Sequence, residues 1–167
     1  LLADNGPGDG SAAAAAAAAT AAGLRLETIP GPGNPGFGAA ANRAVARAAT
    51  DWVLLVNPDG ELDPPCLREL LAVAGERPGA ALVEARQRPF EHPKVYDPAT
   101  LETPWCSAAA VLLRRSAFTA CGGFDESMFL YAEDVDLSWR LRDAGHRLYY
   151  APRAIFHHRT GGRLLRG

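Results

Sequence analysis

Residues 122–140 read GGFDESMFLYAEDVDLSWR, and the rest of the chain is best understood from this stretch. A double-glycine turn leads into an aromatic and acidic loop that ends on Glu133, Asp134 and Asp136. An amphipathic helix follows, because Leu137 and Leu141 lie one helical turn apart.

The acidic residues support two interpretations. Asp134 is a good N-cap, acids in a first turn favour the helix dipole, and Asp136 can pair with Arg140. Alternatively, three neighbouring carboxylates repel one another, and a single cap would suffice, which favours a catalytic site. The loop that leads to these residues is aromatic and apolar, which predicts partial desolvation of one carboxylate. Desolvation raises the pKa of that carboxylate, whereas the helix N-terminus lowers it.

The composition indicates one globular domain, with 167 residues, of which 48% are hydrophobic and 22% charged. A net charge of −2 without a long basic run argues against nucleic acid as a partner. No apolar run approaches the roughly 20 residues that span a bilayer. Three distant cysteines without a CxxC motif, Cys66, Cys106 and Cys121, predict buried, reduced thiols in a cytosolic protein.

The chain alternates between expected strands and helices. Helices are expected at 12–22 (a surface alanine run), 38–49, 64–75 and 114–121, and strands at 24–29, 52–56, 80–85, 105–113 and 147–151. Residues 86–104 form an irregular excursion with four prolines. The alternation predicts an α/β sandwich with a mostly parallel sheet, whose ligands bind beyond the carboxyl ends of the strands. There Asp4, Asn34, Asp59 and Asp134 are expected to converge.

Residues 31–36 match the dinucleotide-binding pattern G-x-G-x-x-G, which would indicate an oxidoreductase. That pattern works through backbone N–H groups directed at a pyrophosphate. Pro30, Pro32 and Pro35 supply none, so this interpretation is the weaker one.

Two further motifs have both a structural and a functional interpretation. Asn57-Pro58-Asp59 ends the buried strand 52–56 and is either a turn or a carboxylate site for Mg²⁺ or Mn²⁺ beside phosphate. His157 and His158 are either a surface pair or a source of a further metal ligand.

Taken together, five motifs in order resemble a known family. They are Asp4-Asn5-x-x-x-Asp9-Gly10-Ser11, Asn34-x-Gly36-Phe37-Gly38-x-x-x-Asn42-Arg43, Asn57-Pro58-Asp59, Gly122-Gly123-Phe124-Asp125-Glu126 with Tyr131-x-Glu133-Asp134-x-Asp136-Leu137-x-x-Arg140, and Pro152 to His158. The pattern resembles that of the inverting glycosyltransferases of family 2, in their rhamnosyltransferase-like branch.

The resemblance implies a GT-A fold and transfer of a sugar, with rhamnose from a dTDP donor, to a saccharide or lipid-linked acceptor in bacterial cell-surface polysaccharide synthesis. It implies a cytoplasmic protein at the inner face of the membrane, with peripheral association. A nucleotide-sugar half would cover about 1–60, and an acceptor and catalytic half about 80–160. Its implied site residues are Asp4, Asn5, Asn34, Gly36, Asn42, Arg43 and Asn57 for the nucleotide-sugar, Asp59 and His158 for Mg²⁺ or Mn²⁺, Asp134 as general base, and Trp105 and Glu133 on the acceptor side. Asp134 and Asp59 should lie on opposite sides of the reacting carbon.

The chain departs from the family pattern in two ways. Leu1–Ala3 is expected to end a strand already under way, and the family's first strand is absent, which suggests N-terminal truncation. Ala108 stands where the family has glycine, which matters if the position needs a positive φ or lets the sugar approach closely. A truncated, inactive domain that does not bind donor productively is therefore the alternative hypothesis.

Overall fold

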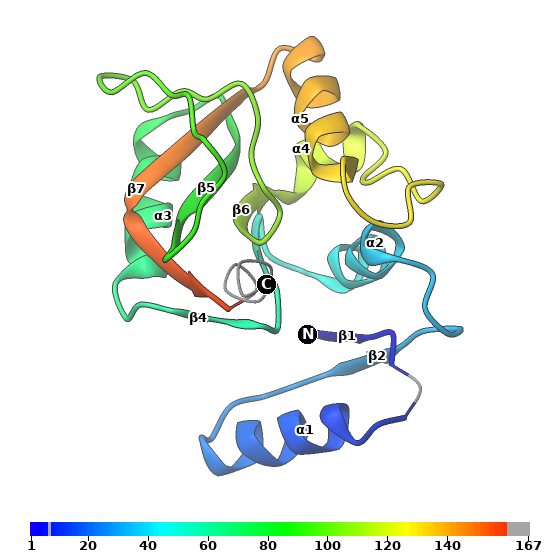
Figure 1. Cartoon of the computed structure of the whole chain (residues 1–167). Helices are drawn as coiled ribbons and strands as arrows, with labels where there is room; N and C mark the ends of the chain where they lie inside the picture. Colours follow the sequence, from blue (N-terminus) through cyan, green and yellow to red (C-terminus); the bar gives the residue numbers. More distant parts are fainter. Residues whose placement is uncertain (7, 160–167) are drawn as a thin grey trace, which may run out of the picture.

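The computed structural model describes residues 1–6 and 8–159, and Figure 1 shows the arrangement of their elements. In chain order these are β1 (Leu2–Asp4), α1 (Ser11–Ala21), β2 (Thr28–Pro30), α2 (Phe37–Arg47), β3 (Trp52–Val56), β4 (Gly60–Leu62), α3 (Cys66–Glu76), β5 (Ala80–Arg88), β6 (Ala110–Arg114), α4 (Arg115–Ala120), α5 (Glu133–Asp143) and β7 (Arg147–His158). The expected α/β class is confirmed. None of the helices in these residues is long and apolar enough to cross a membrane.

The central sheet has five strands in the order β3-β6-β5-β7-β4, and its strand directions are mixed. Only β5 and β7 pair in parallel, whereas β3–β6, β5–β6 and β4–β7 are antiparallel. The expectation of a mostly parallel sheet was therefore wrong. Parallel neighbours need a crossover, usually a helix, but residues 89–109 return the chain from β5 to β6 without one.

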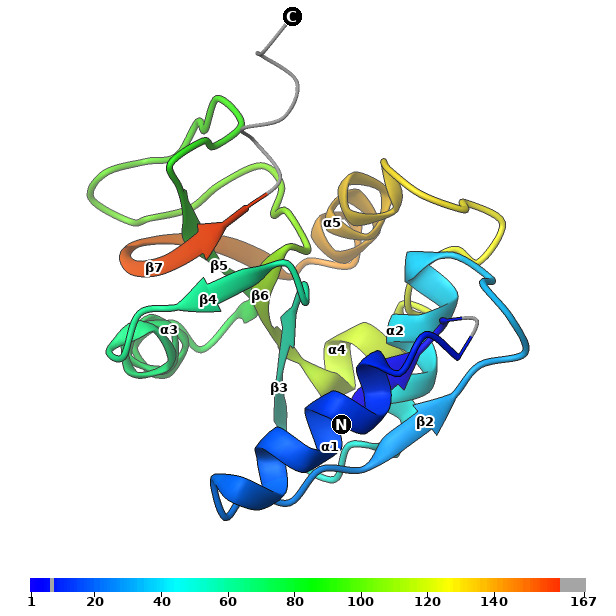
Figure 2. The ribbon, with the colours of Figure 1, turned by 60° about the horizontal axis from the view of Figure 1, so that its bottom comes forward.

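A second, two-stranded sheet joins β1 and β2 in parallel through the crossover helix α1. Figure 2 shows α1 lying outside this sheet, and no α1 residue is buried, as expected of a surface helix. The strand expected at 24–29 is shorter and later, because pairing with β1 covers only 28–30. A hollow of about 830 Å³ separates β1 from β3.

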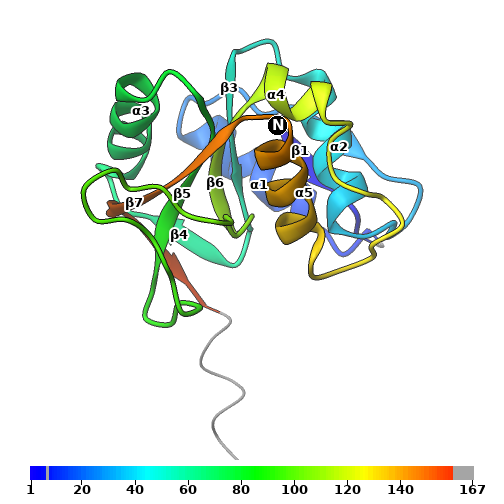
Figure 3. The same cartoon turned by 90° about the horizontal axis from the view of Figure 1, so that it is seen from above.

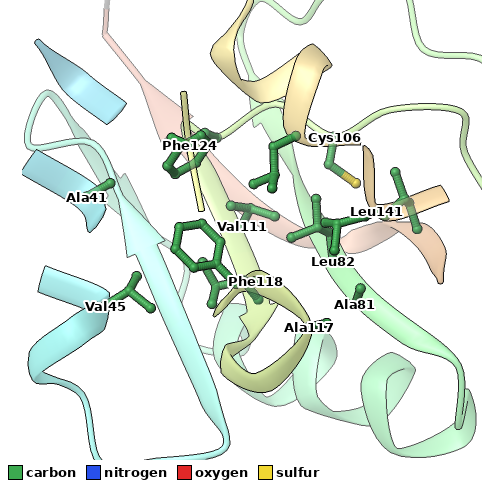
Figure 4. Packing of buried hydrophobic residues seen from close by; sticks show 14 residues of the cluster. Ala41, Val45, Ala81, Leu82, Cys106, Val111, Ala117, Phe118, Phe124 and Leu141 are labelled. Carbon is green, nitrogen blue, oxygen red and sulfur yellow. The ribbon is translucent and has the colours of Figure 1, made fainter. Parts of the chain in front are cut away.

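Helices cover both faces of the central sheet, as Figure 3 shows, with α3 on one side and α2, α4 and α5 on the other. Successive strand residues point to opposite faces. Leu82 therefore packs with α2, α4 and α5, while Val83 packs with α3. In the larger cluster Phe118 and Phe124 meet edge to face between α2 and β6, with ring centroids 5.3 Å apart (Figure 4).

Strands β5 and β7 are longer than their sequence patterns predict, ending at 88 and 158 instead of 85 and 151. The register of their pairing shifts between Ala85 and Arg86, and the pairing then continues from Arg86↔Ile155 to Arg88↔His157. Each strand is therefore prolonged by its contacts with the other. Strand β6 begins at 110 rather than 105, because the Ala109 N–H donates a hydrogen bond to the Ser107 hydroxyl, two residues earlier in the chain.

The cysteines are free thiols, as expected, although only two of them are buried. Cys66 and Cys106 are buried and Cys121 is half-buried. Helix α3 begins at Cys66, after the two prolines rather than at them, so the expected start at 64 was two residues early.

The 89–109 segment is fastened to the sheet by a buried ion pair. Lys94 Nζ lies 2.5 Å from Glu84 Oε2 on β5, with both side chains almost fully buried. The same ammonium lies 3.9 Å from the Trp105 ring centroid and donates to the Trp105 carbonyl. This excursion is therefore ordered by contacts in the core.

The Glu84 carboxyl makes folding stability depend on pH. Burial raises the pKa of Glu84 to about 7 from 4.5, although Lys94 opposes the rise. The folded state thus holds the proton more tightly, so this stabilising contribution is complete below about pH 4.5 and is lost as the pH rises through about 7. We expect the free energy of unfolding, relative to that of Glu84→Gln, to fall between pH 5 and 8. Urea denaturation of both proteins at several pH values measures this difference. A difference that does not change with pH would contradict the prediction.

Candidate active site

Asp59 and His158 meet because strand pairing joins distant segments. Asp59 follows β3 in the turn that leads into β4, and β4 pairs with β7 in the register Gly60↔His158. The pairing places Asp59 Oδ1 3.0 Å from His158 Nε2, although the residues are 99 positions apart. His157, by contrast, turns to Asp63 Oδ1 at 2.8 Å, so of the two histidines only His158 faces Asp59.

The two side chains fit a divalent cation. Two ligands at about 2.1 Å in neighbouring octahedral positions lie about 3.0 Å apart, which matches the observed separation. A carboxylate oxygen with an imidazole nitrogen is a donor set that suits Mn²⁺. Among residues 1–6 and 8–159 no group of three or more His, Cys, Asp or Glu forms a metal cluster.

Asp134 lies in the first turn of α5 and is not its N-cap, contrary to one expectation. The helix begins at Glu133, and the preceding Tyr131 and Ala132 have φ of 71° and 70°. Left-handed backbone at non-glycine residues costs roughly 1–3 kcal/mol each and is typical of functional sites. Ala132 therefore occupies the N-cap position, and Asp134 is the second residue of the helix.

Two backbone N–H groups fix the Asp134 carboxylate. Val135 donates to Oδ1 at 2.8 Å, and Ala108 donates to Oδ2 at 3.2 Å. Among the described residues positive φ outside glycine occurs at Leu101, Tyr131 and Ala132, so alanine at 108 needs no glycine-like backbone. The backbone at this position therefore does not require glycine.

Glu133 is the desolvated carboxylate of this cluster. Its side chain is 5% exposed, and Oε2 is buried without a hydrogen-bond partner among the residues that the structure describes. Burial above all, with the charge of Asp134 adding to it, raises the pKa of Glu133. The expected pair of Asp136 with Arg140 is confirmed at 2.6 Å, and Arg140 also donates to the Gly123 carbonyl, which fastens α5 to the double-glycine turn.

The segment 107–109 lies between the two carboxylate sites. On one side the Ala108 N–H holds Asp134. On the other, the Ala109 carbonyl accepts from the Asn57 N–H at 2.8 Å, next to Asp59. Segment 107–109 thus contacts both sites, and the placement of the two aspartates on opposite sides of a reacting carbon stays a prediction.

Several residues expected on the nucleotide side bind one another. Arg43 Nη2 donates to Asn5 Oδ1 at 2.8 Å, and Asn5 Nδ2 donates to the Gly36 carbonyl at 3.1 Å. Asn34 Oδ1 accepts from the Gly36 N–H at 3.2 Å. The Arg43 Nε is buried without a partner within the described part of the chain. Arg43 therefore reaches toward β1, where a nucleotide is expected.

The remaining nucleotide-side candidates divide into two groups. Asp4, Asn5 and Asn57 line the hollow of about 830 Å³ between β1 and β3. Asn42 does not line it, since its amide binds the Phe124 backbone in both directions at 2.9 Å and also donates to Glu126. Asn42 thus joins α2 to the 122–126 turn.

On the expected acceptor side, Trp105 is half-buried, and its ring packs on Lys94. More exposed apolar side chains, among them Phe129 and Tyr131, belong to the loop before α5. This loop is tied to α2 because Phe37 N–H donates to the Phe129 carbonyl at 3.2 Å. Another hollow, of about 780 Å³, lies between 95–104 and the C-terminal half of α5 and does not include Trp105.

Sequence reasoning missed Gln87 and Ser107. Gln87 Oε1 lies 2.8 Å from His158 Nδ1, and Gln87 Nε2 donates to Ser107 Oγ at 3.2 Å. The expected strand stopped at 85, so Gln87 seemed to belong to an irregular loop. A sequence signal existed, because Glu84 and Gln87 interrupt an apolar strand that is buried on both faces.

The chain matches known proteins along most of its length. The family model Glycosyl transferase family 2 matches residues 1–136. An N-acetylglucosaminyl-diphospho-decaprenol L-rhamnosyltransferase of Mycobacterium tuberculosis is 31% identical over 96% of this chain and 66% of its own length. A pre-mycofactocin glycosyltransferase of the same organism is 33% identical over 80% of this chain and 32% of its own.

A solved mannosyltransferase from Pyrobaculum calidifontis, in complex with GDP-Man and Mn²⁺, superposes with a TM-score of 0.73 at 19% identity, over 96% of this chain and 47% of that one. This likeness confirms the expected GT-A fold. This chain spans about two thirds of the rhamnosyltransferase and about a third of the pre-mycofactocin enzyme. With the family model matching most of its residues, the chain belongs to glycosyl transferase family 2.

Proposed function

We propose that the chain is the core of a metal-dependent inverting glycosyltransferase, which moves a sugar from a nucleoside diphosphate to an acceptor hydroxyl. The observation that carries this proposal is that one short segment, 107–109, contacts both the Asp134 carboxylate and the turn that holds Asp59, which lies 3.0 Å from His158. Inversion requires a leaving-group site and a base site on opposite sides of the reacting carbon, since the acceptor attacks from the face opposite the diphosphate.

Asp59 and His158 would hold Mg²⁺ or Mn²⁺, which supplies charge neutralisation to a diphosphate leaving group when bound. Family membership and the Mn²⁺ complex of the similar mannosyltransferase support this. Asp4, Asn5, Asn34, Gly36, Arg43 and Asn57 would serve the nucleotide side. Asn42 would act there only indirectly, because its amide is occupied by the 122–126 turn.

Asp134 would accept the proton of the acceptor hydroxyl. Each of its carboxylate oxygens accepts one backbone N–H, and each retains a lone pair for a proton. Because those bonds fix the carboxylate before the acceptor arrives, the base needs no reorganisation during transfer. Glu133 would shape the acceptor side from within the core, and Trp105 would present a face to a sugar.

The sugar would be rhamnose and the acceptor a lipid-linked saccharide, as the name of the 31%-identical relative suggests. The family resemblance adds dTDP as the nucleotide and bacterial cell-surface polysaccharide as the product. The protein would then work at the cytoplasmic face of the membrane, associated peripherally. Residues 1–60 would form the nucleotide-sugar half and 80–160 the acceptor half, the two meeting where Asp59 pairs with His158.

Calorimetric titration of the chain with dTDP-rhamnose tests this proposal. We expect binding in the presence of Mn²⁺ and its loss when EDTA removes the metal, because the diphosphate would bind through the cation. UDP-N-acetylglucosamine and GDP-mannose serve as comparison donors and should bind more weakly. If no donor binds in a metal-dependent way, the alternative of a domain that does not bind donor productively gains support.

A further inference from the structure

Gln87 contacts the proposed cation site from inside the protein. It lies at the end of β5, its side chain is 7% exposed, and its Oε1 is 2.8 Å from His158 Nδ1. The pair is 71 positions apart in the sequence and is brought together by the parallel pairing of β5 with β7.

The amide of Gln87 has a defined orientation. Its Nε2 donates to Ser107 Oγ at 3.2 Å, so Oε1 is the atom that faces the imidazole. A carbonyl oxygen only accepts hydrogen bonds, so in this orientation His158 Nδ1 is the donor of the contact when a cation takes the Nε2 side. The other ring nitrogen, Nε2, then faces Asp59 Oδ1 at 3.0 Å.

Buried polar groups also hold Ser107 in place. Ser107 is 8% exposed, and its hydroxyl oxygen accepts from the Ala109 N–H at 3.3 Å. The chain of contacts therefore runs from Asp59 through His158, Gln87 and Ser107 to the segment whose Ala108 N–H holds Asp134. It links the two sides of the site through side chains in the interior.

We propose that Gln87 is a positioning residue, which keeps Nδ1 of His158 protonated and turns Nε2 toward Asp59 for binding a divalent cation. The inference rests on the proposed cation site. A metal-binding histidine generally needs a partner on its other nitrogen, which fixes both the tautomer and the ring plane, and loss of that partner lowers metal affinity about 10- to 100-fold. Gln87 supplies this partner here.

Two substitutions at one position separate positioning from packing. Gln87→Met keeps the volume but removes the acceptor, and we expect the affinity for Mn²⁺ with dTDP, measured by calorimetry, to fall about 10- to 100-fold. Gln87→Glu keeps an acceptor for the Nδ1 proton and should retain at least wild-type affinity. Asp63→Asn is the matched control, since it alters the partner of His157 and not that of His158.

A metal-free measurement tests the orientation itself. In protein with ¹⁵N-labelled histidine we expect a hydrogen-bonded Nδ1–H signal of His158, assigned by its loss in His158→Ala. The signal should persist in Gln87→Glu and Asp63→Asn and disappear in Gln87→Met, with circular dichroism confirming that the variants are folded.

Equal loss of Mn²⁺ affinity in both Gln87 variants, or none in Gln87→Met, would overturn the positioning role. So would a wild-type His158 whose Nδ1 carries no proton. If wild type shows the Nδ1–H signal and its dependence on Gln87 but binds no Mn²⁺, the orientation is supported while the proposed cation-dependent function fails.

Discussion

Asp134→Asn is expected to lower the turnover number for sugar transfer by about 10²- to 10⁴-fold, the usual contribution of a general base. The asparagine side chain keeps the size of the aspartate, and its carbonyl oxygen can accept from one of the two N–H groups of Ala108 and Val135, although its NH2 group cannot accept from the other. The loss that matters for turnover is that of basicity, because an amide does not take the acceptor proton. The measurement is the transfer rate from dTDP-rhamnose to a lipid-linked saccharide acceptor.

Donor binding separates this effect from misfolding. The Mn²⁺-dependent affinity of Asp134→Asn for the donor should equal that of wild type, since Asp59 and His158, and not Asp134, would hold the cation. Asp143→Asn, an exposed carboxylate on the same helix, is the matched control and should keep wild-type turnover. Full turnover in Asp134→Asn would remove the role that we assign to this residue.

Asp59→Asn should abolish metal-dependent donor binding. The substitution keeps the size of the side chain but removes the negative charge that lies 3.0 Å from His158 Nε2. We expect the affinity for the donor with Mn²⁺ to fall by at least roughly 100-fold. Loss of a residue that only hydrogen-bonds to a metal ligand already lowers affinity by up to about 100-fold, and Asp59 would be a ligand itself. Calorimetry with dTDP-rhamnose and Mn²⁺ gives the number.

The control for this prediction lies on the adjoining strand. Glu61→Gln removes an exposed carboxylate two residues further along, and its donor affinity should remain that of wild type. If Asp59→Asn retained Mn²⁺-dependent binding, the cation would have to be held elsewhere. If it retained donor binding that EDTA did not affect, donor recognition would not depend on a cation at all.

The neighbouring carboxylates of Glu133 and Asp134 differ in burial and in hydrogen bonding. Glu133 is buried and its pKa is raised, whereas Asp134 is half-exposed and receives two backbone N–H groups. The apolar loop before α5 predicted one desolvated carboxylate, and this is Glu133. A good leaving group relaxes the demand on a base, which suits the role proposed for Asp134.

The sequence determined those features that depend on local pattern. The all-apolar run 52–56 predicted a strand, although burial on both faces was wrong, because β3 is an edge strand whose residues are only partly buried. The i, i+4 spacing of Asp136 and Arg140 predicted their ion pair, and five ordered motifs predicted the family. Each follows from neighbours within a few residues, or from a motif order that holds whatever the packing. The GT-A fold followed from the family in the same way.

Only the tertiary structure decided how distant segments combine. Strand β6 runs antiparallel to β5 because 89–109 doubles back, with Lys94 held by Glu84 in the core. Helix α5 begins at Glu133 because two residues before it adopt positive φ, which no local propensity indicates. Gln87 meets His158 only through the long parallel pairing of β5 with β7. Strand register sets such contacts, and register depends on the whole sheet rather than on any one stretch of sequence.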